Sequence, residues 1–410
     1  MSKKLNIGLV GFGCVGSGLY EVLNKSGLLG ATIKTIVVKD PTKARSIPKE
    51  AFSYDINSIL DDPDINVLVE LINDSAAAFE IVTSAFRAGK HVVSANKKLI
   101  AEHLDELLDL AEKSQVSFLY EGAVAGSIPI IRNLEEYYNN DSLTSIEGIT
   151  NGTTNYILTQ SNFGVDYSTA LKTAQELGFA EADPTLDVDG FDSKFKLVLL
   201  IKHAFGLSVT PEQIHNIGIR GISEREIAFA AEKGYRIKLL SRAEKIGNEV
   251  LGIVAPYYVS REHPAYEVNN EFNAVIVEAL FSDRQLFLGK GAGSYPTASA
   301  VLSDVSALKF DYRYEYRKSI LPNDLKFSDD VLVHAYIAST DSDLLETIDF
   351  EEIEEQFRSK TYAYKTGLIS FQLLAALNVN ERNDLCVVLL PGAIVQRKVA
   401  LEHASAYELN

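Results

Sequence analysis

Short apolar runs recur through the first 122 residues, and stretches of helical periodicity separate them. Each apolar run has the length of a buried strand, and the stretches between them carry apolar residues at helical spacing. This alternation predicts βαβ units and an N-terminal α/β domain of the Rossmann type, with a doubly wound parallel sheet. The strands are expected at residues 5–11, 31–40, 65–72, 91–96 and 116–122.

The regular alternation of strand and helix ends at about residue 140, and the pattern changes again in the last hundred residues. Three domains are therefore expected. Residues 1–135 form the nucleotide-binding domain, and a loop and helix over about 291–310 cross back to complete it. Residues 136–310 form an α+β domain whose mixed sheet carries packed helices. An aromatic, charged linker follows. Residues 325–410 form a small α+β module in which strand and helix alternate over 330–339, 350–358, 361–367, 369–377 and 385–392.

The net charge, the length of the apolar runs and the cysteine spacing argue against several classes of protein. The formal net charge of −17 repels a phosphate backbone, so nucleic acid is an unlikely class of partner. The longest apolar run, at 197–201, is far too short to span a membrane, and the N-terminus lacks a signal-type cleavage site. Cys14 and Cys386 are far apart and show no metal-type spacing. We therefore expect a cytoplasmic globular protein without structural disulfides.

Three glycines stand between the first strand and the first helix as G-x-G-x-x-G. Gly11 permits a tight turn, Gly13 lets the backbone approach a pyrophosphate, and Gly16 lets the helix close on the strand. This context predicts dinucleotide binding by the turn, which includes Cys14 and Val15. The alternative is a glycine turn that serves only packing.

The second strand ends in Lys39 and Asp40, where the adenosine ribose is expected. An acidic residue there suits the 2′-hydroxyl of NAD, and a basic residue suits the 2′-phosphate of NADP. Lys43 and Arg45 follow closely, so NADP is favoured over NAD. A solvated basic turn is the alternative.

The segment "AEADPTLDVDGFDSKFK" (180–196) crowds five carboxylates and two lysines into seventeen residues. It does not fit a calcium loop, because Thr185 stands where the loop needs a carboxylate and Lys196 stands where it needs a glutamate. Asp192 and Lys196 are four residues apart at the start of an apolar helix, so they share a face. A lysine partly desolvated there and oriented by the aspartate suits proton transfer. A plain surface ion pair is the alternative.

A second lysine site follows the fourth strand, at "ANKK" (95–98). Ligands of open α/β sheets bind at the carboxyl edge of the strands, so Lys97 or Lys98 is expected to reach the cleft. A surface lysine pair is the alternative.

Taken together, segments over about residues 5–308 resemble homoserine dehydrogenase and occur in the same order along the chain. The most specific are "NGTTNYIL" (151–158) and "AEADPT…DV.G.D…K" (180–196). The remaining matches are "GLVGFGCVGSG" (8–18), "AGKHVVSANKKLIA" (88–101), "YEGAVAGSIPIIR" (120–132), "KGYRIKLL" (233–240) and "GKGAGSYPTASAVLSD" (289–304). The resemblance implies reversible, NAD(P)-dependent interconversion of L-aspartate 4-semialdehyde and L-homoserine, a step in threonine, methionine and isoleucine biosynthesis.

The resemblance also implies roles for individual residues. Lys196 matches the lysine proposed to donate a proton to the aldehyde oxygen, and Asp192 matches its partner. Lys97 matches a lysine near both substrate and nicotinamide. The implied substrate-binding residues are Glu181, Asp187, Gly152 and Thr153. The implied cofactor residues beyond the glycine turn and Lys39 are Asn73, Lys97 and Gly293, and the main-chain carbonyls implied to hold a structural Na⁺ are those of Glu121, Val124, Gly126 and Ile128.

Some positions depart from the family pattern. Asn73 and Asp74 stand where Gly-Gly is common after the third strand, and Phe179 replaces a common Tyr. Lys290 replaces a common Pro. The C-terminal residues have the size of an ACT module but lack its usual signature, so an ACT-like module is expected, with effector binding left open. The resemblance suggests a homodimer or homotetramer formed through the sheet of the second domain.

Two other functions remain alternatives at this point. The first alternative is another NAD(P)-dependent oxidoreductase of similar architecture. The second is a non-catalytic regulator that senses nucleotides. The family-specific segments argue against the first, and the retained Asp192 and Lys196 argue against the second. Replacing Lys196 by alanine separates the readings, because only a catalytic lysine is needed for turnover.

Overall fold

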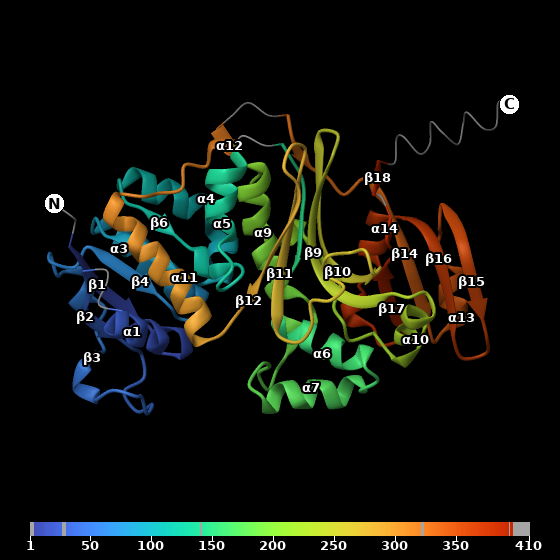
Figure 1. The fold of residues 1–410 in the computed structure, drawn as a ribbon, viewed down its shortest axis with the longest axis horizontal. Helices are drawn as coiled ribbons and strands as arrows, with labels where there is room; N and C mark the ends of the chain where they lie inside the picture. The colour runs from blue at the N-terminus through green and yellow to red at the C-terminus, as the bar shows by residue number, and fades with distance from the viewer. Residues whose placement is uncertain (1–3, 27–29, 140–141, 321–323, 393, 397–410) are drawn as a thin grey trace. The chain divides into compact units, whose positions relative to one another are not determined.

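The computed structural model describes residues 4–26, 30–139, 142–320, 324–392 and 394–396. The predicted first domain therefore begins with three residues outside this range, and the predicted C-terminal module ends with residues 397–410 outside it. The chain forms two compact units. The first comprises residues up to 140, 202–210 and 287–320, and the second comprises the rest (Figure 1).

The first unit is built on a parallel sheet with strand order β3-β2-β1-β4-β5-β6. Apart from Asn6, the residues of β1 (Leu5–Val10) are buried, as expected for a central strand covered on both faces. The other strands are β2 (Ala31–Val37), β3 (Phe52–Ser53), β4 (Val67–Glu70), β5 (His91–Ser94) and β6 (Phe118–Leu119). The predicted doubly wound parallel sheet is confirmed.

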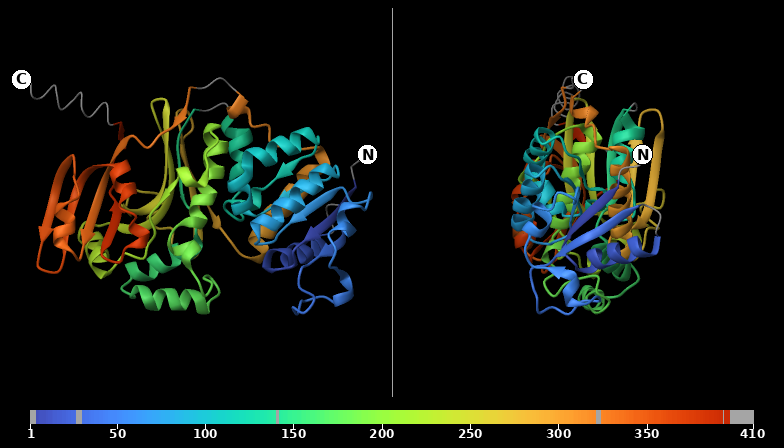
Figure 2. Two further views of the ribbon diagram at one scale, coloured as in Figure 1. Left: turned by 180° about the vertical axis from the view of Figure 1, so that it is seen from behind. Right: turned by 90° about the vertical axis from the view of Figure 1, so that its left-hand side faces the viewer.

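Helices of the first unit start where polar side chains cap them. Asp74 caps α3 (Ser75–Arg87) and Asn96 caps α4 (Lys97–Lys113), each by accepting a hydrogen bond from a backbone N–H of the first turn. α11 (Ser294–Ala307) packs beside α1 (Cys14–Ser26), although some 270 residues separate them (Figures 1 and 2). The unit also contains α2 (Asn57–Leu60), α5 (Ile130–Glu136), α12 (Arg317–Ile320), η1 (Lys49–Ala51), η2 (Glu121–Ala123), η3 (Tyr137–Asn139) and η5 (Leu308–Phe310).

The second unit is built on a mixed sheet with the order β12-β11-β7-β9-β10-β17-β14-β16-β15. Its centre is the long antiparallel pair of β9 (Arg236–Ile246) and β10 (Glu249–Val259). The other strands are β7 (Leu143–Ile149), β8 (His215–Asn216), β11 (Phe272–Ala279), β12 (Asp283–Lys290), β13 (Lys326–Phe327), β14 (Val331–Ser339), β15 (Glu352–Arg358), β16 (Ala363–Ser370), β17 (Leu385–Leu389) and β18 (Val395–Gln396). The helices are α6 (Gly152–Asn162), α7 (Tyr167–Glu176), α8 (Thr185–Val188), α9 (Phe191–Phe205), α10 (Glu224–Glu232), α13 (Ser342–Glu346) and α14 (Phe371–Ala376), with η4 (Pro211–Gln213) and η6 (Val379–Glu381).

The C-terminal strands continue this sheet, because β17 pairs with β10. The expected alternation of strand and helix is wrong at 350–358, where the chain forms β15 and pairs antiparallel with β16. The ring of Phe357 stacks on Tyr364 of β16, a cross-strand contact that favours the strand. One apolar cluster runs through both parts of the unit, from Ile253 of β10 to Val333 of β14.

The expected linker after α11 is packed rather than solvated in its described part. Tyr314 is buried, and its hydroxyl accepts a hydrogen bond from the backbone N–H of Tyr120. The hydroxyl of Tyr316 lies 2.8 Å from that of Tyr120. Across the described ranges, the helices fall short of the length and apolar character that crossing a membrane requires.

Candidate functional site

The start of α9 places a lysine and an aspartate against the end of β7. The ammonium of Lys196 donates to Oδ2 of Asp192 at 2.7 Å and to the backbone carbonyl of Thr150 at 2.6 Å. Both side chains are only 8% exposed. The pair is therefore a buried, hydrogen-bonded ion pair, not the exposed surface pair that the sequence left open.

Asn151 joins this pair to a second carboxylate, and the sequence reasoning missed it. Its amide nitrogen donates to Asp192 at 2.9 Å and to Asp187 at 2.7 Å. Its amide oxygen accepts from the backbone N–H of Thr154 and so caps α6. The helix that Asn151 caps was not predicted either, so the local sequence gave no reason to single out this residue.

Of the other predicted substrate residues, Gly152 and Thr153 lie at the start of α6, and Glu181 lies in the loop before α8. Gly152 is the first residue of α6, and a Cβ there would meet the backbone oxygen of Glu271 at 2.7 Å. The hydroxyl of Thr153 donates to the carbonyl of Phe179 at 2.6 Å. Glu181 is exposed, and its backbone carbonyl accepts a hydrogen bond from the side-chain amide of Gln175 at 3.0 Å. The structure thus brings Asp187, Asp192 and Lys196 around Asn151, while Glu181 stays at the surface.

The three glycines of the first turn each meet the steric need of a dinucleotide turn. Gly11 has a φ of 96°, and a Cβ there would lie 2.5 Å from the carbonyl oxygen of Leu71. A Cβ at Gly16 would lie 2.3 Å from the carbonyl oxygen of Gly11. Around Gly13 there is open space, and Cys14 beside it is exposed at the start of α1, with Val15 half-buried. The turn therefore fits a pyrophosphate at a helix N-terminus.

The basic end of β2 is exposed. The Lys39 side chain is 95% exposed and lies 4.0 Å from the carboxylate of Asp74. Asp40 accepts from both the backbone N–H and the hydroxyl of Thr42, and these hydrogen bonds lower its pKa. Asp74, one of the departures from the family pattern, caps α3, and Asn73 before it is exposed.

Lys97 opens α4 directly after its cap, Asn96, whose amide donates to the carbonyl of Ile72. Beneath this edge of the sheet, Glu70 is fully buried and accepts from the backbone N–H of Ile72 at 2.7 Å and from Ser94 at 2.5 Å. Burial raises the pKa of Glu70 to about 7.

The segment with the predicted cation ligands is a buried turn. Glu121 is buried, its carboxylate accepts from the backbone N–H groups of Ile131 and Arg132, and burial raises its pKa to about 7. Gly126 has a φ of 56°, and a Cβ there would collide with the backbone of Gly291. Within the described chain, the carbonyls of Val124 and Gly126 accept no hydrogen bond, and that of Ile128 accepts one from Ile130.

Such buried carbonyl oxygens suit a hard monovalent cation. Side chains of His, Cys, Asp and Glu form no metal-binding group of three or more in the part of the chain that the structure describes. Gly293, with a φ of 115°, precedes α11, and Ser294 donates to the carbonyl of Cys14 at 2.8 Å.

Comparisons with known proteins agree with these features. A family model described as homoserine dehydrogenase matches residues 129–306, and one described as homoserine dehydrogenase, NAD binding domain, matches residues 11–121. The chain is 39% identical over 321 residues to the homoserine dehydrogenase of Bacillus subtilis, covering 76% of this chain and 74% of that protein. It is 41% identical over 315 residues to that of Synechocystis sp., covering 73% and 72%.

Solved structures extend the likeness to the C-terminal part. A homoserine dehydrogenase from Thiobacillus denitrificans superposes with a TM-score of 0.83 at 29% identity, covering 95% of this chain and 98% of that one. A hyperthermophilic archaeal homoserine dehydrogenase in complex with NADPH has a TM-score of 0.65 at 26% identity, covering 76% and 99%. The chain belongs to the homoserine dehydrogenase family, enzymes that are NAD(P)-dependent oxidoreductases acting on a small molecule.

Proposed function

We propose that the chain reduces L-aspartate 4-semialdehyde reversibly to L-homoserine with NADP(H), and that Lys196 is the proton donor. The buried, hydrogen-bonded pair of Lys196 and Asp192 is the observation that carries the proposal. Further hydrogen bonds to Thr150 and Asn151 satisfy both buried groups and hold the lysine in one position, as a proton donor requires.

The cofactor, when bound, supplies or accepts the hydride at the carbon of the aldehyde or alcohol. As hydride reaches the aldehyde carbon, negative charge grows on the aldehyde oxygen. The ammonium of Lys196 stabilises this charge and transfers a proton to the oxygen, which leaves a neutral amine. In the oxidation, this neutral amine takes the hydroxyl proton and becomes the ammonium again. Asp192 holds the lysine in place through the 2.7 Å hydrogen bond. We assign Lys97 a further role close to the substrate and the nicotinamide.

Recognition of the amino-acid end of the substrate is assigned to the residues around α6. The ammonium of the substrate requires a carboxylate, and Glu181 and Asp187 are the proposed partners. The backbone at Gly152 and the hydroxyl of Thr153 are proposed to bind the substrate at the helix N-terminus, where the dipole favours a carboxylate.

For the cofactor, the glycine turn from Gly11 to Gly16 is proposed to hold the pyrophosphate, with Cys14, Val15, Asn73 and Gly293 beside it. The exposed Lys39 supports a preference for NADP over NAD, because its ammonium suits the 2′-phosphate. The archaeal relative's complex with NADPH is consistent with this preference. A structural Na⁺ is proposed at the carbonyls of Glu121, Val124, Gly126 and Ile128. Support comes from the carbonyls of Val124 and Gly126, which accept no hydrogen bond from the described residues.

We further propose a homodimer or homotetramer that works in the cytoplasm. Both cysteines are free, which suits a reducing compartment. The C-terminal residues, described as far as 396, are proposed to be an ACT-like module on the basis of their strands and helices.

The reverse reaction tests the proposal. Purified protein is mixed with L-homoserine and either NADP⁺ or NAD⁺, with Na⁺ present at alkaline pH, and reduced nicotinamide is followed by absorbance. We expect turnover that is faster with NADP⁺. The absence of turnover with both cofactors contradicts the proposal and favours a regulator or an enzyme for another substrate.

A further inference from the structure

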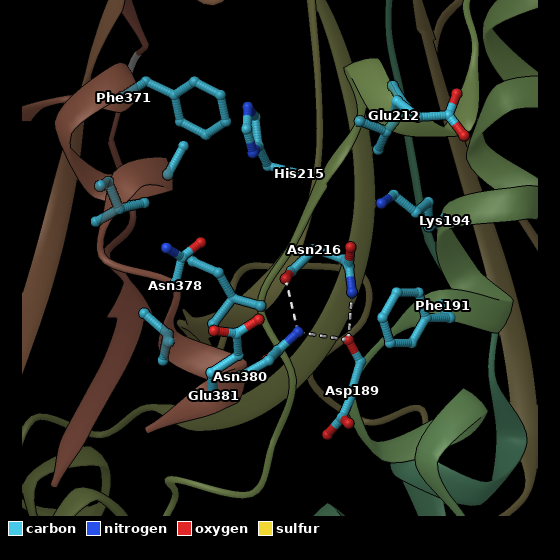
Figure 3. Close-up of a pocket in the computed structure, with 15 residues that line it drawn as sticks. Asp189, Phe191, Lys194, Glu212, His215, Asn216, Phe371, Asn378, Asn380 and Glu381 are labelled. Atoms are coloured by element: carbon cyan, nitrogen blue, oxygen red, sulfur yellow. Dashed lines mark hydrogen bonds between the residues drawn. The ribbon is translucent and has the colours of Figure 1, made fainter. Parts of the chain in front are cut away.

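A cavity of about 320 Å³ lies within the second unit, apart from the groups assigned to the reaction. Its walls come from the start of α9, from β8, and from α14 and η6 of the C-terminal part (Figure 3). This volume is that of a site for a small organic molecule.

One side of the cavity offers two nitrogen groups. Lys194 and His215 both line it, and both are half-buried. Within the described chain neither side chain has a hydrogen-bond partner: Lys194 lies 5.6 Å from the ring centre of Phe191, and His215 packs on the edge of Phe371. Burial lowers the pKa of both groups. A bound anion would offset the cost of burying the ammonium of Lys194 and would accept a hydrogen bond from the imidazole N–H of His215.

A second wall of the cavity is apolar, and its Phe371 lies beside the ring of His215 (Figure 3). Phe371, Leu374 and Ala375 of α14 line it together with Val379 of η6. Phe371 and Leu374 are each 1% exposed, so this wall is part of the packed core and not a loose surface. A short aliphatic group is the chemistry that such a wall accepts.

The floor of the cavity is fixed by an amide network. Asn216 and Asn380 both donate to the backbone carbonyl of Asp189, at 2.7 and 3.2 Å, and Asn380 also donates to the carbonyl of Asn216 (Figure 3). These bonds join β8, η6 and the residues just before α9. The cavity is therefore a preformed site, which limits the ordering cost of binding.

Acidic groups lie at the rim. Glu212 and Glu381 line the cavity, and both residues are exposed. Glu212 acts electrostatically on Lys194, and Asp329 acts on His215. Two carboxylates at the entrance disfavour a dianion such as phosphate, so a monoanion is the better match.

We propose that this cavity binds a small monocarboxylate with a short aliphatic tail, its carboxylate on Lys194 and His215 and its tail against Phe371 and Leu374. The site goes beyond the proposed reaction and uses none of the groups assigned to it. Lys194 lies between Asp192 and Lys196 on α9, so a ligand here contacts the helix that carries the proposed proton donor.

Saturation-transfer NMR with 3-methylbutanoate as the probe tests the proposal. L-homoserine is present in excess, so that the proposed substrate site does not report. The isosteric neutral compound 3-methylbutanamide is the ligand control. Lys194→Gln removes the cation, and Ala375→Phe fills the apolar side. Lys172→Gln, at an exposed lysine of α7, is the matched protein control.

We expect the probe to bind the wild type and Lys172→Gln alike, and to bind Lys194→Gln about tenfold more weakly because one charge-assisted contact is lost. Ala375→Phe should weaken binding as well. Unchanged binding by both cavity variants, equal binding of the amide, or no protein-dependent signal from the probe would each overturn the proposal. The readout is binding, so a failure of turnover leaves this test intact.

Discussion

The ammonium of Lys196 lies 2.7 Å from Oδ2 of Asp192, one helical turn earlier on α9, and both groups are buried. Burying two charges costs free energy that their attraction only partly offsets, while leaving one of them unpaired costs about 3–5 kcal/mol. The pair is therefore a weak source of stability, and proton transfer gives a stronger reason for its presence.

This relationship predicts that stability and activity can be separated. Lys196→Met should lower the free energy of unfolding by about 3 kcal/mol, because Asp192 is left buried without its cation. The double variant Asp192→Leu/Lys196→Met should regain most of that stability but no activity. Urea unfolding and turnover measure the two effects. Recovery of activity in the double variant would contradict the assigned role.

Asn151 is predicted to be a positioning residue. Asn151→Asp keeps the oxygen that caps α6 but replaces the donor to Asp187 and Asp192 with a third carboxylate. Like charges then repel, so kcat should fall about tenfold to a hundredfold, an effect of about 1.4–2.7 kcal/mol. Asn151→Ala should in addition lose about 1 kcal/mol of stability with the cap. A kcat equal to that of the wild type in Asn151→Asp would refute this role.

Two glycines of the first turn should respond differently to alanine. Gly13 faces open space, so Gly13→Ala should leave stability unchanged while its methyl group obstructs the pyrophosphate and weakens cofactor binding. Gly11→Ala combines a φ of 96° with a contact at 2.5 Å to Leu71, so it should destabilise the fold. Thermal unfolding with and without NADP⁺ distinguishes the two. Equal behaviour of the two variants would argue that the turn serves packing alone.

Lys39 is predicted to select the cofactor. Lys39→Ala should raise KM for NADP⁺ about tenfold, through loss of one charge-assisted contact, and leave KM for NAD⁺ unchanged. Lys49→Ala, at another exposed lysine of the same unit, is the control. If both cofactors are affected equally, Lys39 does not read the 2′-phosphate.

Glu70 should make stability depend on pH. Its pKa is about 7 in the folded state, against 4.5 for the free side chain. Between these values the folded state binds more protons than the unfolded state, so stability falls as pH rises from about 4.5 to 7. The loss is up to about 3 kcal/mol and is complete above pH 7. Glu70→Gln should abolish this dependence, since an amide does not titrate.

Urea unfolding of the wild type and Glu70→Gln at pH 5 and pH 8 measures the difference. The variant should gain stability relative to the wild type at pH 8 only. The same difference at both pH values would mean that Glu70 keeps an ordinary pKa in the folded protein.

The parts predicted best from sequence were local. The glycine turn and the Asp192–Lys196 spacing each lie within a few residues, so helix and turn geometry fix them. Asn151 was missed because its partners are 36 and 41 residues away. The pairing of β17 with β10 could not be predicted either, because the local sequence of a strand does not identify the strand with which it pairs. The secondary structure of residues 350–358 was predicted wrongly because their strand conformation depends on pairing with β16, which the local sequence does not show.

Turnover of Lys196→Met with L-homoserine and NADP⁺ tests the central claim most directly, with Lys172→Met as the surface control and cofactor binding measured in parallel. Loss of the proton donor should lower kcat about 10²- to 10⁴-fold while NADP⁺ binding stays unchanged. A kcat within about threefold of the wild type, a difference of under about 1 kcal/mol, would contradict the assignment of Lys196 as proton donor.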